Sequence, residues 1–259
     1  MRLDKYLADA GLGTRSEMKS AIRKGKVTVD GITVTDPGLQ VDEARHVQYG
    51  EQSVASAKPL YYMFHKPAGC VCATRDPETT VLDFFPPQTG KKLFPVGRLD
   101  KDTEGLLLLT DDGAFAHRIT SPRKHVSKLY YFEGEGSLAA DCAAQFAEGM
   151  DIGDETKTRP AEIAFLSNHD DGRIQGNYPK ASAADILQRE EPMNPACDTR
   201  GILQITEGRY HQVKRMLKKC GVTVIYLKRL SIGSLTLDAA LERGAYRALT
   251  PEELKMLGV

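Results

Sequence analysis

Residues 97–105 bring three carboxylates and two basic side chains together on a short segment that begins and ends with glycine. Four leucines follow directly, at residues 106–109, and predict a fully buried strand. Charged loops anchored to a rigid core element often hold reactive groups. A carboxylate in such a loop could act as a nucleophile. The three acids could also bind a metal ion, but ligation usually needs a further histidine or carboxylate at a defined spacing.

Two further segments carry side chains suited to chemistry. Lys128 and Tyr130 lie two residues apart on a predicted strand, which puts both on one face and Tyr131 on the other. A tyrosine ring can stack on another flat group, and its hydroxyl can relay a proton. Residues 207–216 read Glu-Gly-Arg-Tyr-His-Gln-Val-Lys-Arg-Met and place several cations beside apolar residues at helical spacing. Taken singly, a tyrosine such as Tyr130 is more often a core residue, and a loop aspartate more often bonds its own backbone.

The elements around these segments predict an α+β domain, because strands and helices do not alternate as they do in a parallel sheet. Strand-like runs occur at residues 60–65, 71–73, 106–110, 128–133, 202–206, 222–227 and 234–237, and helical runs occur at 112–119, 138–148 and 211–220. The two aspartates after the buried strand, Asp111 and Asp112, are expected to cap the helix that follows them.

The first fifty residues predict a small separate unit of two helices and a hairpin. Residues 3–10 place apolar side chains on one helical face, and Thr14 and Glu17 form a capping-box pattern for a second helix. Asp30-Gly31 is a strong two-residue turn signal between strands 27–29 and 32–34. Five cations lie around the second helix and its exit: Arg15, Lys19, Arg23, Lys24 and Lys26. Small and polar residues then predict an interdomain linker at 51–59, followed by a second domain at 60–259.

One polar, acidic and proline-containing segment, residues 167–198, fits this pattern poorly and is interpreted as an insertion between two strands. Residues 183–188 within it could form one helical turn. Its charge argues against direct contact with phosphates.

Composition places the chain among soluble globular proteins, with 41% hydrophobic and 27% charged residues and a net charge of zero. We expect no membrane span, no secretion signal and a cytoplasmic location, and the odd number of cysteines, five, favours reduced thiols.

The charge is distributed unevenly along the sequence. Residues 1–26 carry seven basic and three acidic side chains, and residues 200–230 carry eight basic and one acidic. Two basic segments could face a phosphate backbone, although ordinary solvated surfaces would give the same counts.

Residues 97–105 closely resemble the signature loop of the RsuA-type pseudouridine synthases, which isomerise uridine in ribosomal RNA. The resemblance implies that Asp100 is the catalytic nucleophile, that Tyr130 packs on the target base, and that Lys214 pairs with Asp100. It also implies substrate-binding roles for Arg98, Leu227, Arg209 and Arg123. His211 is expected to be a structural hydrogen-bond donor. Arg-Leu-Asp-Lys-Tyr-Leu at residues 2–7 and Gly-Lys-Val-Thr-Val-Asp-Gly at 25–31 resemble the small S4-type RNA-binding domain.

The same resemblance implies a mixed, mainly antiparallel sheet of pseudouridine synthase type for the catalytic domain. It implies a reaction that breaks the glycosidic bond, rotates the base and rejoins it through carbon, with no metal or other cofactor. The best-matching substrate is a single uridine of 16S ribosomal RNA, met within a small-subunit assembly intermediate by a monomeric enzyme. A 23S RNA synthase, a non-catalytic ribosome-assembly factor and a glycosidase-like hydrolase are the alternatives. The attacked atom, on the uracil ring or on the sugar, stays open.

Overall fold

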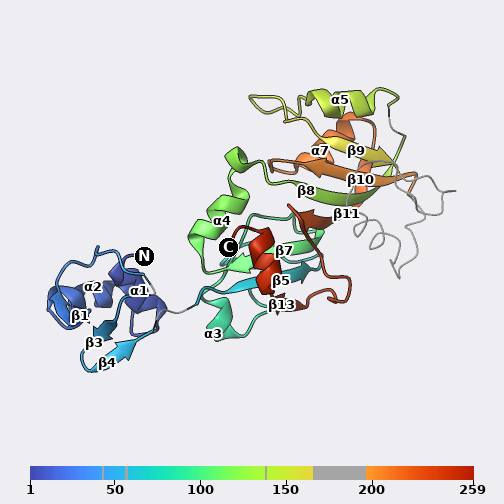
Figure 1. Ribbon diagram of the computed structural model, residues 1–259. Helices are drawn as coiled ribbons and strands as arrows, with labels where there is room; N and C mark the ends of the chain where they lie inside the picture. The colour runs from blue at the N-terminus through green and yellow to red at the C-terminus, as the bar shows by residue number, and fades with distance from the viewer. Residues whose placement is uncertain (43, 56–57, 138, 166–196) are drawn as a thin grey trace. The chain divides into compact units, whose positions relative to one another are not determined.

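A computed structural model of the chain describes residues 1–259 except 43, 56–57, 138 and 166–196 (Figure 1). The chain divides into two compact units, Met1–Pro59 and Leu60–Val259. Apart from its last two residues, the insertion expected at 167–198 lies outside the described residues, and so does the helical turn expected at 183–188. Among the described residues, no helix is both long and apolar enough to cross a membrane.

The N-terminal unit, Met1–Pro59, packs two helices on a four-stranded antiparallel sheet of order β2-β1-β3-β4. Its elements are α1 Leu3–Asp9, α2 Arg15–Arg23, β1 Val27–Val29, β2 Ile32–Val34, β3 Val47–Tyr49 and β4 Gln52–Val54. The predicted helices and the first hairpin are confirmed. Thr14 and Glu17 form the expected capping box, and Asp30 and Gly31 adopt the positive φ angles that a tight hairpin turn needs.

The predicted linker at 51–59 begins too early, because Gln52–Val54 form β4 and pair with β3. Val54 is buried in the core of the unit, and its carbonyl accepts a hydrogen bond of 2.9 Å from the hydroxyl of Tyr6. A short polar stretch around one buried valine is enough for an edge strand, and hydrophobic patterning does not reveal such a strand.

The second unit, Leu60–Val259, is built on a nine-stranded sheet whose main path runs β13-β5-β7-β11-β8-β10-β9. The strands are β5 Tyr61–Lys66, β6 Phe94–Pro95, β7 Glu104–Thr110, β8 Lys128–Glu135, β9 Glu162–Phe165, β10 Thr199–Ile205, β11 Thr223–Ile232, β12 Leu235–Thr236 and β13 Tyr246–Ala248. Every pairing is antiparallel except that of β7 with β11. This confirms the predicted α+β class with a mixed, mainly antiparallel sheet.

Helices cover both faces of this sheet (Figure 1). They are α3 Pro87–Gly90, α4 Gly113–Thr120, α5 Cys142–Glu148, α7 Gln212–Lys219 and α8 Pro251–Met256, with a 3-10 turn, η1, at Pro122–Lys124. Asp112 caps α4 as expected, since its carboxylate accepts hydrogen bonds from the backbone of Ala114 and Phe115. The strand predicted at 71–73 is wrong, because Val71 forms only an isolated bridge with Thr80.

Strand β7 is the centre of the unit, and all seven of its residues are buried. Its leucines alternate between two cores. Leu107 and Leu109 pack in one hydrophobic cluster, and Leu106 and Leu108 pack in the other. Burial on both faces explains the continuous leucine run, because neither side of the strand meets water. The segment that precedes β7 is thereby joined to a strand that is buried on both faces.

Candidate active site

The loop at residues 97–103 connects β6 to β7 and carries Asp100. Its end is shaped by a backbone hydrogen bond of 3.1 Å from Thr103 to the carbonyl of Asp100. Gly105 follows with φ +102°, and a Cβ placed there would lie 2.2 Å from the carbonyl oxygen of Arg229. Only glycine therefore allows β11 to approach β7 in parallel, directly behind the loop.

Lys66 holds the same loop from behind. Its ammonium group donates hydrogen bonds to the carbonyls of Pro67, Lys101 and Thr103, at 3.1, 3.2 and 2.9 Å. The side chain is completely buried, and this burial lowers its pKa. Lys66 cannot contact RNA, because its side chain is buried and its ammonium group donates to the carbonyls that shape the loop.

Lys214 reaches the loop from α7. Its ammonium nitrogen lies 3.4 Å from Oδ2 of Asp100 and 2.5 Å from Oδ1 of Asp102. Burial raises the pKa of Asp102, but the hydrogen bond and charge of Lys214 outweigh this effect, and the pKa is lowered overall. The side chain of Asp100 is 26% exposed, so solvent reaches it. The predicted neighbours are therefore close together, and Lys214 is shared between two aspartates.

The three acids of the loop do not converge. Glu104 turns away to Tyr226, whose hydroxyl donates to it at 2.9 Å, and to Arg243 at 3.3 Å. In the part of the chain that the structure describes, no three His, Cys, Asp or Glu side chains are arranged to hold a metal ion.

His211 also lies beside Asp100, with its Nε2 at 3.5 Å from Oδ1 of the aspartate. It precedes α7 in the left-handed backbone region, with φ 48°. The sequence-based expectation of a structural hydrogen-bond donor stays a prediction, but it did not name Asp100 as the neighbour of His211. A usable signal was present, since residues three apart at a helix start share a face, and Lys214 is three residues further on.

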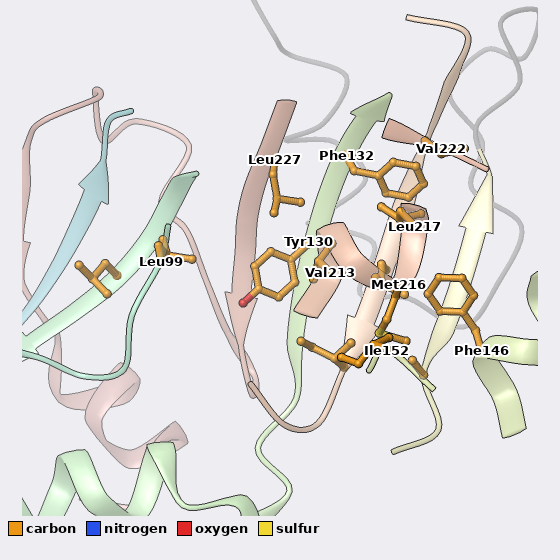
Figure 2. Close-up of a cluster of buried hydrophobic side chains, with 14 of the residues drawn as sticks. Leu99, Tyr130, Phe132, Phe146, Ile152, Val213, Met216, Leu217, Val222 and Leu227 are labelled. Atoms are coloured by element: carbon orange, nitrogen blue, oxygen red, sulfur yellow. The ribbon is translucent and has the colours of Figure 1, made fainter. Parts of the chain in front are cut away.

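Tyr130 and Leu227 project from β8 and β11 into one cluster of buried side chains, which also contains Leu99 and Val213 (Figure 2). Leu99 directly precedes Asp100, so this cluster adjoins the loop. The tyrosine hydroxyl lies 3.5 Å from Nη1 of Arg229, its register partner on β11. Tyr130 is 7% exposed and Leu227 is 4% exposed.

Lys128 stands two residues before Tyr130 and donates a hydrogen bond of 2.8 Å to the carbonyl of Val126. Burial, helped by the charge of Arg229, lowers its pKa to about 8. The Lys-Leu-Tyr segment thus places a lysine with a lowered pKa and an aromatic ring on one strand.

Two of the predicted substrate-binding arginines, Arg98 and Arg123, are exposed. Arg209 is different, because its guanidinium group is taken up by the protein. It donates 2.6 Å hydrogen bonds to the carbonyls of Thr156 and Lys157 and lies 3.3 Å from Glu207. These contacts fix Arg209 against the 154–159 segment, and its expected role in substrate binding stays a prediction.

The five basic residues expected to bind RNA in the N-terminal unit fall into two groups. Arg15 and Lys19 contact the carboxylate of Asp4 at 3.3 and 3.9 Å. Arg23, Lys24 and Lys26 are exposed around the end of α2.

Two family models match the chain, one for each of its two units. The RNA pseudouridylate synthase family model matches residues 60–219, well over half of the chain. The chain belongs to this family. The S4 domain model matches residues 1–47. The predicted enzyme class, an isomerase that converts uridine to pseudouridine in RNA, is thereby confirmed, and the relatives below confirm the RsuA-type resemblance.

Relatives match along the whole length. "Ribosomal small subunit pseudouridine synthase A" of Escherichia coli is 40% identical, with 98% of each chain covered. An uncharacterized RNA pseudouridine synthase of Bacillus subtilis is also 40% identical, covering 99% of this chain and 98% of its own. Among solved structures, a pseudouridylate synthase shares 35% identity at a TM-score of 0.63, with 99% of each chain covered. This family's fold therefore extends over both units.

Proposed function

We propose that this chain isomerises a single uridine of 16S ribosomal RNA, with Asp100 as the nucleophile. The observation that carries the assignment is the position of Asp100 on a clamped loop, within 3.4 Å of Lys214 and next to the cluster of Tyr130 and Leu227. The small-subunit substrate is supported by the name of the Escherichia coli relative, which is 40% identical over nearly its full length.

The reaction breaks the bond between C1′ and N1 of uridine, turns the detached base, and forms a bond between C1′ and C5, which then loses its proton. Asp100 supplies the attacking carboxylate, and the positive charge of Lys214 keeps that carboxylate ionised and oriented. Tyr130 and Leu227 hold the everted base, because an aromatic ring and an aliphatic side chain can pack on its two faces. Attack at the uracil ring and attack at the sugar carbon both use the same carboxylate.

The N-terminal unit supplies RNA affinity in this proposal. Arg23, Lys24 and Lys26 are exposed and face no internal carboxylate in the described residues. Such side chains neutralise phosphates without reading sequence. All of the proposed catalytic residues come from one unit of one chain, which supports a monomeric enzyme. We place it in the cytoplasm, on an assembly intermediate of the small subunit.

The test is to incubate the purified chain with unmodified 16S RNA, with 23S RNA and with small-subunit assembly intermediates, and to map pseudouridine by its chemical adduct. We expect one modified position in the 16S RNA and none when Asp100→Asn replaces the natural chain. A product only in 23S RNA would overturn the substrate assignment. Tight RNA binding without any product would favour a non-catalytic assembly factor.

A further inference from the structure

Tyr210 is an aromatic side chain left in water beside the active site. It is 72% exposed and is the only aromatic among the exposed large hydrophobic side chains of the described residues. Tyr210 belongs to none of the buried hydrophobic clusters of the described residues, so its ring is open to a partner outside the chain.

The ring of Tyr210 is joined to Asp100 through one intervening side chain. It stacks on the imidazole of His211, with ring centroids 3.9 Å apart and planes inclined by 16°. That imidazole in turn lies 3.5 Å from the carboxylate of Asp100. A line of contacts therefore runs from the proposed nucleophile through His211 to the solvent-exposed ring of Tyr210.

The backbone that carries this stack is fixed by its neighbours. Arg215 donates a hydrogen bond of 3.1 Å to the carbonyl of Tyr210. The amide of Arg209 donates to Gln212, and Gln212 donates to the buried carboxylate of Glu207, at 2.9 and 3.0 Å. His211 is held in the left-handed region, which side chains rarely adopt. An exposed ring held in one orientation is prepared for a ligand, because little entropy is lost when a flat partner stacks on it.

We propose that Tyr210 stacks on the nucleobase that neighbours the target uridine in the RNA chain. This rests on the proposed function, since it needs a uridine everted at Asp100. Eversion removes a stacking partner from the adjacent base, and proteins commonly replace such a partner with an aromatic side chain. The ring and not the phenolic hydroxyl makes the contact, so Tyr210 contributes RNA affinity and positioning and takes no part in the chemical step.

The test compares Tyr210→Ala and Tyr210→Phe with the natural chain on a short 16S RNA fragment that contains the target uridine. Met256→Ala serves as the matched control, because Met256 is also exposed, at 58%, on the C-terminal helix. Loss of one base stack weakens RNA binding about 5- to 100-fold. We expect Tyr210→Ala to raise KM by this factor with little change in kcat, and we expect Tyr210→Phe and Met256→Ala to match the natural chain.

Two further RNAs make the assignment specific. Each lacks one base, on the 5′ or on the 3′ side of the target uridine. On one of them the difference between Tyr210→Ala and the natural chain should disappear, because the stacking partner is gone from the RNA. The thermal unfolding of all variants should coincide, since the side chain is exposed.

The inference is overturned if Tyr210→Ala modifies the intact fragment as well as the natural chain does, or if its defect persists on both abasic RNAs. It is also overturned if Tyr210→Phe is as defective as Tyr210→Ala. In each of these results the natural chain still forms pseudouridine, so the proposed function stands. If the natural chain forms no pseudouridine in any RNA, the proposed function fails and this contact fails with it.

Discussion

Asp4 and Asp100, one in each unit, are both aspartates that contact cationic side chains. They differ in whether their carboxylate oxygens remain accessible to a substrate after those contacts are made. The side chain of Asp4 is fully buried and accepts hydrogen bonds from Arg2 and Arg15 at 3.1 to 3.3 Å. The hydrogen bonds from Arg2, followed by the one from Arg15, lower its pKa to about 2 against the opposing effect of burial. Such a carboxylate has no free oxygen with which to attack a substrate.

Asp100 has the same type of side chain in an open position. Its side chain is 26% exposed, and within the described residues the ammonium of Lys214 lies 3.4 Å and the imidazole of His211 lies 3.5 Å from its carboxylate. The shortest bond of Lys214 goes to Asp102 and not to Asp100. A carboxylate that lies near a cation but still has oxygens free of hydrogen bonds can attack a substrate. This difference separates a reactive aspartate from a structural one.

After the loss of the nucleophile itself, the largest effect is expected at the shared cation, Lys214. Lys214→Met removes the charge that orients Asp100, and loss of one such electrostatic contact lowers turnover about 100- to 1,000-fold. Lys214→Arg keeps the charge and should retain most of the activity. Single-turnover rates at saturating RNA measure both. Equal activity of Lys214→Met and the natural chain would show that Asp100 needs no cation.

A second cation, Lys66, sharpens the comparison because its hydrogen bonds within the described residues go to backbone carbonyls. Lys66→Met leaves buried carbonyl oxygens of the loop unpaired, which costs about 2–3 kcal/mol of unfolding free energy. Denaturant unfolding of the full chain measures this loss. Turnover should fall as well, since the loop that carries Asp100 loses its anchor. If stability is unchanged, the loop is held by other contacts.

The pH dependence of the N-terminal unit tests the saturated aspartate. The pKa of Asp4 is about 2 in the folded unit against an ordinary value of 3.8, so the folded state releases its proton more readily than the unfolded state does. The resulting stabilisation is complete above about pH 4 and is lost as the pH falls towards about 2. Titration of the Asp4 carboxyl carbon by NMR, in native and in urea-unfolded protein, checks both values. Coincident midpoints would contradict the account.

The smallest effect concerns salt. Replacing Lys24 and Lys26 by alanine removes two exposed charges, and the slope of RNA affinity against salt should fall by about 1 to 2. Turnover at saturating RNA should be unchanged. Lys19→Ala is the matched control. The ammonium of Lys19 lies 3.9 Å from the carboxylate of Asp4, so its charge is already partly neutralised and it should contribute less to phosphate binding. An equal change in slope for the control would remove the distinction between the two groups of cations.

The sequence predicted those features that depend on local patterns. The hairpin at Asp30-Gly31, the capping box at Thr14 and the buried leucine strand are each determined by neighbouring residues, and each is confirmed. The buried face of α7 follows in the same way from its helical spacing, since Val213, Met216 and Leu217 are buried.

The remaining features depend on contacts between distant segments. Lys66 resembles any surface lysine in the sequence, and only its three carbonyl acceptors reveal it as a loop anchor. Arg209 is bound by a segment more than fifty residues earlier in the chain. β11 extends five residues beyond its predicted end because two register shifts keep it paired with β8. No local pattern encodes such partners.

The most direct test compares two aspartates on one loop. Asp100 and Asp102 both contact Lys214, but only Asp100 is proposed to attack the nucleotide. Single-turnover rates of pseudouridine formation should fall on the order of 10⁴-fold or more in Asp100→Asn, as they do when a nucleophile is removed, and less than about 10-fold in Asp102→Asn. RNA affinity should be nearly equal in the two variants. If Asp102→Asn is the inactive variant and Asp100→Asn still turns over, the nucleophile has been assigned to the wrong carboxylate.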